Sequence, residues 1–436
     1  MIKYLLKKLE NYFGFKTLGS TWKIEILAGL STFLSLSYIF VVNPSILSEA
    51  GIDKSVAFFA TILVSSLATI LMGLWANKPF SLAPGLEMNG YVAFVVVGTL
   101  GFIWQDALGA VFWSGILMLI VNFLRIREHI IKAIPDKLKS GLAAAVGVFL
   151  MLIALKVSGV LAYEEIQVTG IGLLTSPEAC VFYVGLAVAL ILRYFKLKGG
   201  VLISIIIASI SAHLLGIGEV IEPIKVSKEM FNGVFALNFG VILDPKVWSV
   251  ILILFIIDFY GSIAKFIGLT RNTTIVDKNG DMPKMKEALT IDGAATTVGG
   301  ILGTTNLTPY VESAVGIGEG GRSGLVFVVS GILMLLFLLL TPLVNLVPVV
   351  ATTGALFFVG LILLPTKADL KNYHWSDTIA VLAMIVATIW TFGLDKAMLF
   401  GFGLYIILQV VRGEWRKVNP YLLASTILVL VSILLA

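Results

Sequence analysis

Apolar stretches follow one another along nearly the whole chain, separated by short polar segments. Most are about 17 to 25 residues long, which lets a helix cross the roughly 30 Å hydrocarbon core of a bilayer. The pattern predicts an all-α integral membrane protein with fourteen transmembrane segments. They are expected near 22–43, 55–76, 79–97, 103–124, 138–156, 177–194, 199–216, 247–270, 286–303, 304–320, 323–344, 348–364, 376–392 and 395–411. A shorter apolar stretch at 421–436 fits either a further span or an interfacial helix.

The composition supports this interpretation. Of the 436 residues, 58% are hydrophobic and 13% are charged, and the mean hydropathy is +1.00. A soluble domain of this size could not bury so much apolar surface in its core. Cys180 is the single cysteine, which excludes an intramolecular disulfide and a cysteine metal cluster. We therefore expect a multi-pass protein of the cell membrane, with no metal and no cofactor.

The positive charges are distributed unevenly between the loops. The formal net charge is +5, and most lysines and arginines fall at the N-terminus and in the even-numbered loops. The odd-numbered loops contain few cations, namely Lys54, Lys156, Lys225, Lys228, Lys246 and Lys396. This asymmetry follows the positive-inside rule and predicts a cytoplasmic N-terminus. Membrane orientation therefore accounts for the basic charge, and no nucleic-acid partner is expected.

Two short motifs interrupt the hydrophobic pattern at matching places in the two halves. Pro84 precedes Glu87 by three residues, and Pro309 precedes Glu312 in the same way, 225 positions later. A carboxylate inside hydrocarbon costs about 2.5–3.5 kcal/mol, so the matched pair indicates one site with two related halves. A repeat of seven segments, an odd number, places the second copy upside down relative to the first. Inverted repeats with interrupted helices are typical of secondary transporters.

The repeats predict how the chain is organised. The first inverted repeat is expected at 1–220, the second at 245–412, and a basic stretch with the last apolar segment at 413–436. Segments three and ten are broken, each proline being expected at the first position of a half-helix that follows extended backbone. Non-helical backbone at membrane depth needs partners. We therefore expect the extended pieces at 80–83 and 306–308 to pair as short strands or to line a site.

Several polar residues within the apolar segments could carry chemistry. Glu87 and Glu312 are expected in the first turns of the half-helices, where an anion is best tolerated; capping is the structural alternative. Asp258 and Lys265, seven residues apart, share one helix face. Their structural alternatives are a bond to a neighbouring helix and snorkelling to the cytoplasmic interface. Asn89 fits either a bond between helices or a substrate contact.

Other motifs do not indicate catalysis. Asp292 in segment nine is expected to be structural. The glycine-rich stretch at 316–321 resembles a phosphate loop, but it follows a half-helix and lacks the Gly-Lys-Ser/Thr that such a loop requires, so we expect a helix end there. The sequence contains no signature of a nucleotide-hydrolysing module or a membrane protease. The protein is therefore not expected to be an enzyme, and uphill transport would need an ion gradient.

Three blocks of the chain resemble a known family. They read GTTNLTPYVESAVGIGEGGRSG at 303–324, TFLSLSYIFVVNPSIL at 32–47 and APGLEMN at 83–89. The blocks are similar to those of the Azg-like purine permeases, a branch of the nucleobase–cation symporters related to the xanthine, uracil and vitamin C permeases. The similarity extends over nearly the whole length.

The resemblance implies both a fold and an activity. The implied fold has two inverted repeats of seven segments, with a core domain (segments 1–4 and 8–11) moving against a gate domain (segments 5–7 and 12–14). The implied activity is import of purine bases together with protons. The family's substrate-contacting positions correspond here to Asn89, Asp258 and Glu312.

The chain departs from the family pattern near these positions. Glu87 stands where the family usually has glycine, and Lys265 stands where glycine is common. The usual Asp-Thr-x-Gly-Thr of segment eight reads Asp-Phe-Tyr-Gly-Ser at 258–262. We therefore expect Lys265 and Glu87 to modify the site.

The expected function is import of purine nucleobases such as guanine, hypoxanthine or adenine. In this hypothesis Glu312 and Asp258 accept hydrogen bonds from N–H groups of the base, and Asn89 reads its edge. Phe259 or Tyr310 offers a flat face for stacking. The alternatives are another nucleobase, uracil or xanthine, and an anion of the sulfate or bicarbonate type.

The coupling ion is expected to be a proton, with Na⁺ as the alternative. Two carboxylates that face one cavity resist being ionised together. Glu312, Asp258 or Glu87 is therefore expected to take up and release a proton during each cycle. The sequence leaves open whether the gate domains pair in a homodimer.

Overall fold

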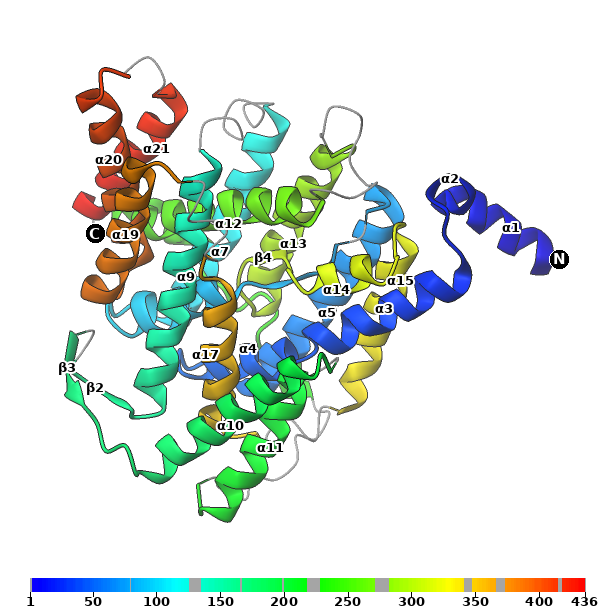
Figure 1. Cartoon of the computed structure of the whole chain (residues 1–436), viewed down its shortest axis with the longest axis horizontal. Coiled ribbons are helices and arrows are strands. Elements are labelled where there is room, and N and C mark those ends of the chain that lie inside the picture. Colours follow the sequence, from blue (N-terminus) through cyan, green and yellow to red (C-terminus); the bar gives the residue numbers. More distant parts are fainter. Residues whose placement is uncertain are drawn as a thin grey trace.

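The computed structural model describes residues 2–78, 80–124, 135–164, 167–197, 200–217, 228–270, 282–340, 347–365, 373–414 and 418–435. The described chain is a bundle of helices, with a short N-terminal helix pair that projects from one side (Figure 1). Among these residues, six helices are long and apolar enough to cross a membrane by length and composition. Shorter apolar helices lie between and after them.

The elements of the first half follow the expected segments closely. In chain order they are α1 (Ile2–Phe13), α2 (Phe15–Leu18), α3 (Trp22–Leu36), α4 (Ile39–Ser48), α5 (Lys54–Leu71), the π-helix η1 (Met72–Ala76), β1 (Leu82–Pro84), α6 (Leu86–Gly90), the π-helix η2 (Tyr91–Val97), α7 (Trp104–Phe123), α9 (Asp136–Val157), β2 (Leu161–Glu164), β3 (Gln167–Ile171), α10 (Pro177–Tyr194) and α11 (Gly200–Leu214). The side chain of Ser176 caps helix α10, and Pro177 occupies its first turn; both residue types are favoured at these positions.

The second half has a comparable order of elements. They are the 3₁₀ helices η3 (Lys228–Phe231) and η4 (Phe239–Leu243), then α12 (Pro245–Thr270), α13 (Met285–Leu302), β4 (Leu307–Pro309), α14 (Ser313–Gly318), α15 (Leu325–Leu336), η5 (Phe337–Leu340), η6 (Val349–Thr352), α17 (Thr353–Ile362), α19 (Trp375–Thr391), α20 (Leu394–Val411) and α21 (Pro420–Leu435). The end of the segment expected at 323–344 lies outside the described residues, as do 415–417 of the basic stretch. Helix α21 packs against α12 and α20.

The helices pack in two groups. In one group, α15 packs against α3 and α5, and α7 packs against α12 and α13. In the other, α9 packs against α17 and α19, and α10 packs against α11 and α17. Glycines allow a close approach in the second group, since a Cβ added to Gly360 would lie 2.5 Å from the carbonyl oxygen of Gly147. Small residues at such contacts let helix backbones meet.

The two broken segments meet in an antiparallel strand pair. Strand β1 pairs with β4 in the register Leu82 to Pro309, Ala83 to Thr308 and Pro84 to Leu307. Backbone bonds extend the pair on both sides, from Gly85 N to Asn306 O at 3.0 Å and from Tyr310 N to Ser81 O at 2.9 Å. The expected pairing of the extended pieces is confirmed. It satisfies backbone groups that would otherwise be unpaired in the protein interior.

The expected position of the two prolines is wrong. Pro84 and Pro309 end the strands instead of beginning the half-helices. Helix α6 begins at Leu86 with Gly85 as its cap, and α14 begins at Ser313 with Glu312 at the N-cap. The strand pair extends to the prolines themselves, because Pro lacks only the N–H and its φ suits extended backbone as well as a first helical turn.

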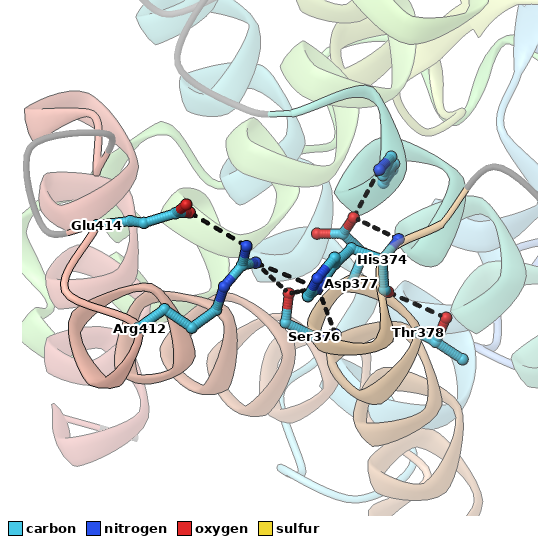
Figure 2. Close-up of polar contacts among 7 residues, drawn as sticks. His374, Ser376, Asp377, Thr378, Arg412 and Glu414 are labelled. Carbon is cyan, nitrogen blue, oxygen red and sulfur yellow. Dashed lines mark hydrogen bonds and ion pairs between the residues drawn. The ribbon is translucent and has the colours of Figure 1, made fainter.

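A polar cluster joins the second helix group at its edge. Figure 2 shows Arg412, at the end of α20, directed toward His374 and Ser376 at the start of α19. Asp377 accepts a bond from the backbone N–H of His374 at 3.1 Å and pairs with Lys137 of α9 at 2.6 Å. The cluster thereby caps α19 and fastens it to α9 and α20.

Candidate functional site

The candidate site is built around the strand pair and the two half-helices that follow it. Glu87 is the second residue of α6, and Glu312 is the N-cap residue of α14. Tyr310 links the two strands, because its hydroxyl donates to the carbonyl oxygen of Pro84 at 2.6 Å. The starts of α6 and α14, far apart in the sequence, therefore lie beside the same strand pair. We call this strand pair, together with the starts of the two half-helices, the crossing.

Glu312 has one occupied and one unoccupied carboxylate oxygen. Its Oε1 accepts a hydrogen bond from the hydroxyl of Tyr38 at 2.8 Å. Its Oε2 is buried and has no hydrogen-bond partner among the residues that the structure describes. A buried carboxylate oxygen without a donor is costly, so Oε2 is suited to bind a ligand N–H or a proton.

Asn89 presents the complementary group. Its side chain is fully buried, and its Oδ1 accepts a bond from the hydroxyl of Thr305. Its Nδ2 has no partner in the described part of the chain. Asn89 can therefore donate to a ligand through Nδ2, while one lone pair of its Oδ1 is already used by the protein.

Asp258 is buried and is held by three donors. Its Oδ2 accepts from Thr296 Oγ1 and Asn306 Nδ2, each at 3.1 Å, and its Oδ1 accepts from Ser262 Oγ at 3.3 Å. The hydroxyl groups of Ser262 and Thr308 also form a hydrogen bond, with their oxygens 3.2 Å apart. Asp258 thereby fastens α12 to α13 and to the start of β4.

We expect Asp258→Asn to lower the free energy of unfolding by about 1–3 kcal/mol. The amide nitrogen of the variant would face at least one of the groups that now donate to a carboxylate oxygen of Asp258. That buried donor would lose its acceptor. Thermal unfolding of the purified protein in detergent measures the effect. Asp244→Asn is the matched control, because Asp244 is exposed and accepts a single bond from the backbone N–H of Lys246. Equal stability losses in the two variants would contradict the anchoring role.

Lys265 pairs with Glu87. The ammonium donates to Glu87 Oε1 and to Thr308 Oγ1, each at 3.0 Å. The snorkelling alternative for Lys265 is therefore wrong, because an anion and a hydroxyl at the crossing satisfy the ammonium where it stands. Glu312 and Asp258 both lie within electrostatic range of this pair. The structure thus brings three expected acids and one base together.

Phe259 and Asp292 lie in the packed interior. Phe259 is fully buried and stacks on Phe255, with ring centroids 5.3 Å apart and planes at 28°. Asp292 is also fully buried, and neither of its carboxylate oxygens has a hydrogen-bond partner among the described residues. It lies within electrostatic range of Asp258.

The sequence interpretation missed the neutral hydroxyls of the site. Tyr38, Thr305 and Thr308 each bind one of the expected charged or amide groups. All three lie inside the blocks at 32–47 and 303–324 that carried the family resemblance. The polar side chains within these two otherwise apolar blocks are the sequence feature that could have indicated these hydrogen-bond partners.

Comparisons with known proteins identify relatives of the whole chain. The sequence profile described as "Permease family" matches residues 23–401. The adenine permease AdeP of Escherichia coli is 34% identical over 432 residues, which cover 98% of this chain and 96% of that protein. The guanine/hypoxanthine permease PbuO of Bacillus subtilis is 30% identical over 424 residues, which cover 95% of this chain and 98% of that protein. The chain belongs to this permease family. The resemblance of the three sequence blocks is confirmed, and the permease is a transport protein rather than an enzyme.

The fold of the permease is shared with a solved membrane transporter. The transmembrane domain of the cyanobacterial bicarbonate transporter BicA superposes with a TM-score of 0.64 at 14% sequence identity. The match covers 92% of this chain and 96% of that domain. Together with the apolar helices, it makes this permease a multi-pass membrane protein.

Proposed function

We propose that this permease is a secondary active transporter that imports purine nucleobases by proton symport. The observation that carries the proposal is the pair of unpartnered buried atoms, Nδ2 of Asn89 and Oε2 of Glu312. One donor and one acceptor, each on a half-helix that follows a paired strand, suit the edge of a base that also carries both kinds of group. Several relatives, among them AdeP and PbuO, are named for the purine bases that they carry.

The proposed cycle is alternating access between two domains. Segments 1–4 and 8–11 would form the core and segments 5–7 and 12–14 the gate, within inverted repeats at 1–220 and 245–412. The two packing groups of helices support this division. Helix α6 also packs against α9, so the half-helix that bears Asn89 lies at the boundary between the groups. A site at such a boundary can be opened to either side by rocking one group against the other.

The proposed coupling proton binds at the acids of the crossing. Glu312, Asp258 and Glu87 share one neighbourhood, in which Lys265 is the one cation among the described residues. An excess of carboxylates in a buried site is relieved when one of them is protonated. Glu312 is the favoured carrier, because its Oε2 lacks a protein donor. The orientation with a cytoplasmic N-terminus and pairing of gate domains in a homodimer belong to the same proposal.

Anion transport is the competing function. Solved structures of the same fold include a bicarbonate transporter, and facing half-helix N-termini attract anions. The three acids at the crossing disfavour this function, because they would repel an anionic substrate. The fold likeness at 14% identity does not transfer a substrate.

Flux into proteoliposomes tests the proposal. The purified protein is reconstituted, and uptake of labelled hypoxanthine, guanine and adenine is measured with and without an inward proton gradient. We expect accumulation of at least one base that is abolished by a protonophore and is insensitive to a Na⁺ gradient. Uptake of sulfate or bicarbonate without uptake of any base would overturn the proposal in favour of the competing function.

A further inference from the structure

The two departures from the family pattern are the two partners of one ion pair. Glu87 belongs to α6 and Lys265 to α12, 178 residues later in the sequence, yet their charged groups are 3.0 Å apart. Each stands where the resembled family usually or commonly has glycine. The pair is therefore one feature of this chain, placed beside Asn89 and the strands.

The ammonium of Lys265 is fixed in position and still accessible. It donates to Glu87 Oε1 and to Thr308 Oγ1, which accounts for two of its three N–H groups. The Lys265 side chain keeps 20% of its surface accessible, whereas Thr308 keeps 1%. The third N–H group is not used by either of these contacts and can donate to a ligand at the crossing.

The hydrogen-bonding groups of the site have a defined pattern. Lys265 can only donate, and Asn89 offers its Nδ2, unpartnered in the described chain, as a donor, while its Oδ1 already accepts from Thr305. Glu312 offers an acceptor at Oε2. Two donors and one acceptor that is fully unpartnered among the described residues, Glu312 Oε2, are therefore available to a ligand.

This pattern matches one subclass of purines. Guanine and hypoxanthine carry adjacent acceptors at N7 and O6, the edge that lysine and arginine recognise, and a donor at N1. Adenine has an amino group in place of O6, and its N6/N7 edge is read by an amide that both donates and accepts. An ammonium beside that amino group would set donor against donor.

We infer that the Glu87–Lys265 pair selects 6-oxopurines over adenine. The inference rests on the proposed function and refines its substrate. Lys265 donates to the N7/O6 edge, Glu312 accepts from N1–H, and Glu87 holds the ammonium in place without leaving a net charge. Overall identity does not make this distinction, since it is 34% to an adenine permease and 30% to a guanine/hypoxanthine permease.

Competition binding on the full-length purified protein tests the inference. Labelled hypoxanthine is displaced by unlabelled hypoxanthine, guanine, adenine and 7-deazahypoxanthine, which lacks the N7 acceptor. We expect adenine and 7-deazahypoxanthine to bind about tenfold or more weakly than hypoxanthine. Adenine binding as tight as hypoxanthine binding would overturn the inference and leave the proposed function intact. Binding of no purine at all would refute the proposed function itself.

Variants assign the preference to the pair. In Glu87→Gln/Lys265→Met both charges are removed together, so no buried charge is left unpaired, and we expect the preference for hypoxanthine over adenine to fall about tenfold. Lys246→Met is the matched control, because Lys246 is exposed at the start of the same helix; its preference should equal that of the unmodified protein. An unchanged preference in the double variant would overturn the role of the pair. Where the variant fails to fold, the ligand series on the unmodified protein still tests the preference for 6-oxopurines over adenine.

Discussion

Glu312→Gln is expected to lower the affinity for purine bases about 10- to 100-fold and to abolish the acceleration of uptake by an inward proton gradient. The substitution keeps the size of the side chain and the acceptor that Tyr38 binds. It replaces the unpartnered Oε2 with an amide that cannot accept from a base N–H and cannot carry a proton. Both proposed roles of Glu312 are therefore lost in one step.

Three measurements on reconstituted protein separate these roles. Binding of hypoxanthine reports the substrate contact, exchange of internal for external base reports movement of the loaded carrier, and uphill uptake reports proton coupling. Glu178→Gln on α10 is the matched control and should behave as the unmodified protein. Full proton-driven accumulation by Glu312→Gln would remove Glu312 from the coupling mechanism.

The crossing of the two broken segments could be predicted because its signals are local. A proline and a glutamate at a fixed spacing, repeated 225 positions later, mark breaks in the apolar pattern. Extended backbone in the interior needs partners, and each break is the natural partner of the other. Strands β1 and β4 pair as this argument requires.

The partners of the charged groups could not be predicted in the same way. The spacing of Asp258 and Lys265 places them on one helix face, but it does not say which other helix lies opposite. Lys265 reaches Glu87 because α12 lies beside the crossing, and that arrangement depends on packing along the whole chain. The start of each half-helix was misplaced for a related reason, since proline suits both a strand end and a first helical turn.

The second large effect is expected from Lys265→Met. This substitution removes the cation from a pair in which the Glu87 side chain is only 9% accessible. Removing one partner of a buried ion pair typically costs about 3–5 kcal/mol, because the other charge is left uncompensated. We therefore expect Lys265→Met to lower the free energy of unfolding by about 3 kcal/mol or more.

The double variant Glu87→Gln/Lys265→Met distinguishes pairing from simple loss of packing. Because neither charge is then present, its stability should return to within about 1 kcal/mol of the unmodified protein. Thermal unfolding of the unmodified protein, both single variants and the double variant completes the cycle. Additive losses would mean that Glu87 and Lys265 contribute separately. If the second substitution instead restores most of the stability lost in Lys265→Met, Glu87 is tolerated at the crossing because Lys265 neutralises it. A chain that acquired one of these residues would then be under pressure to acquire the other.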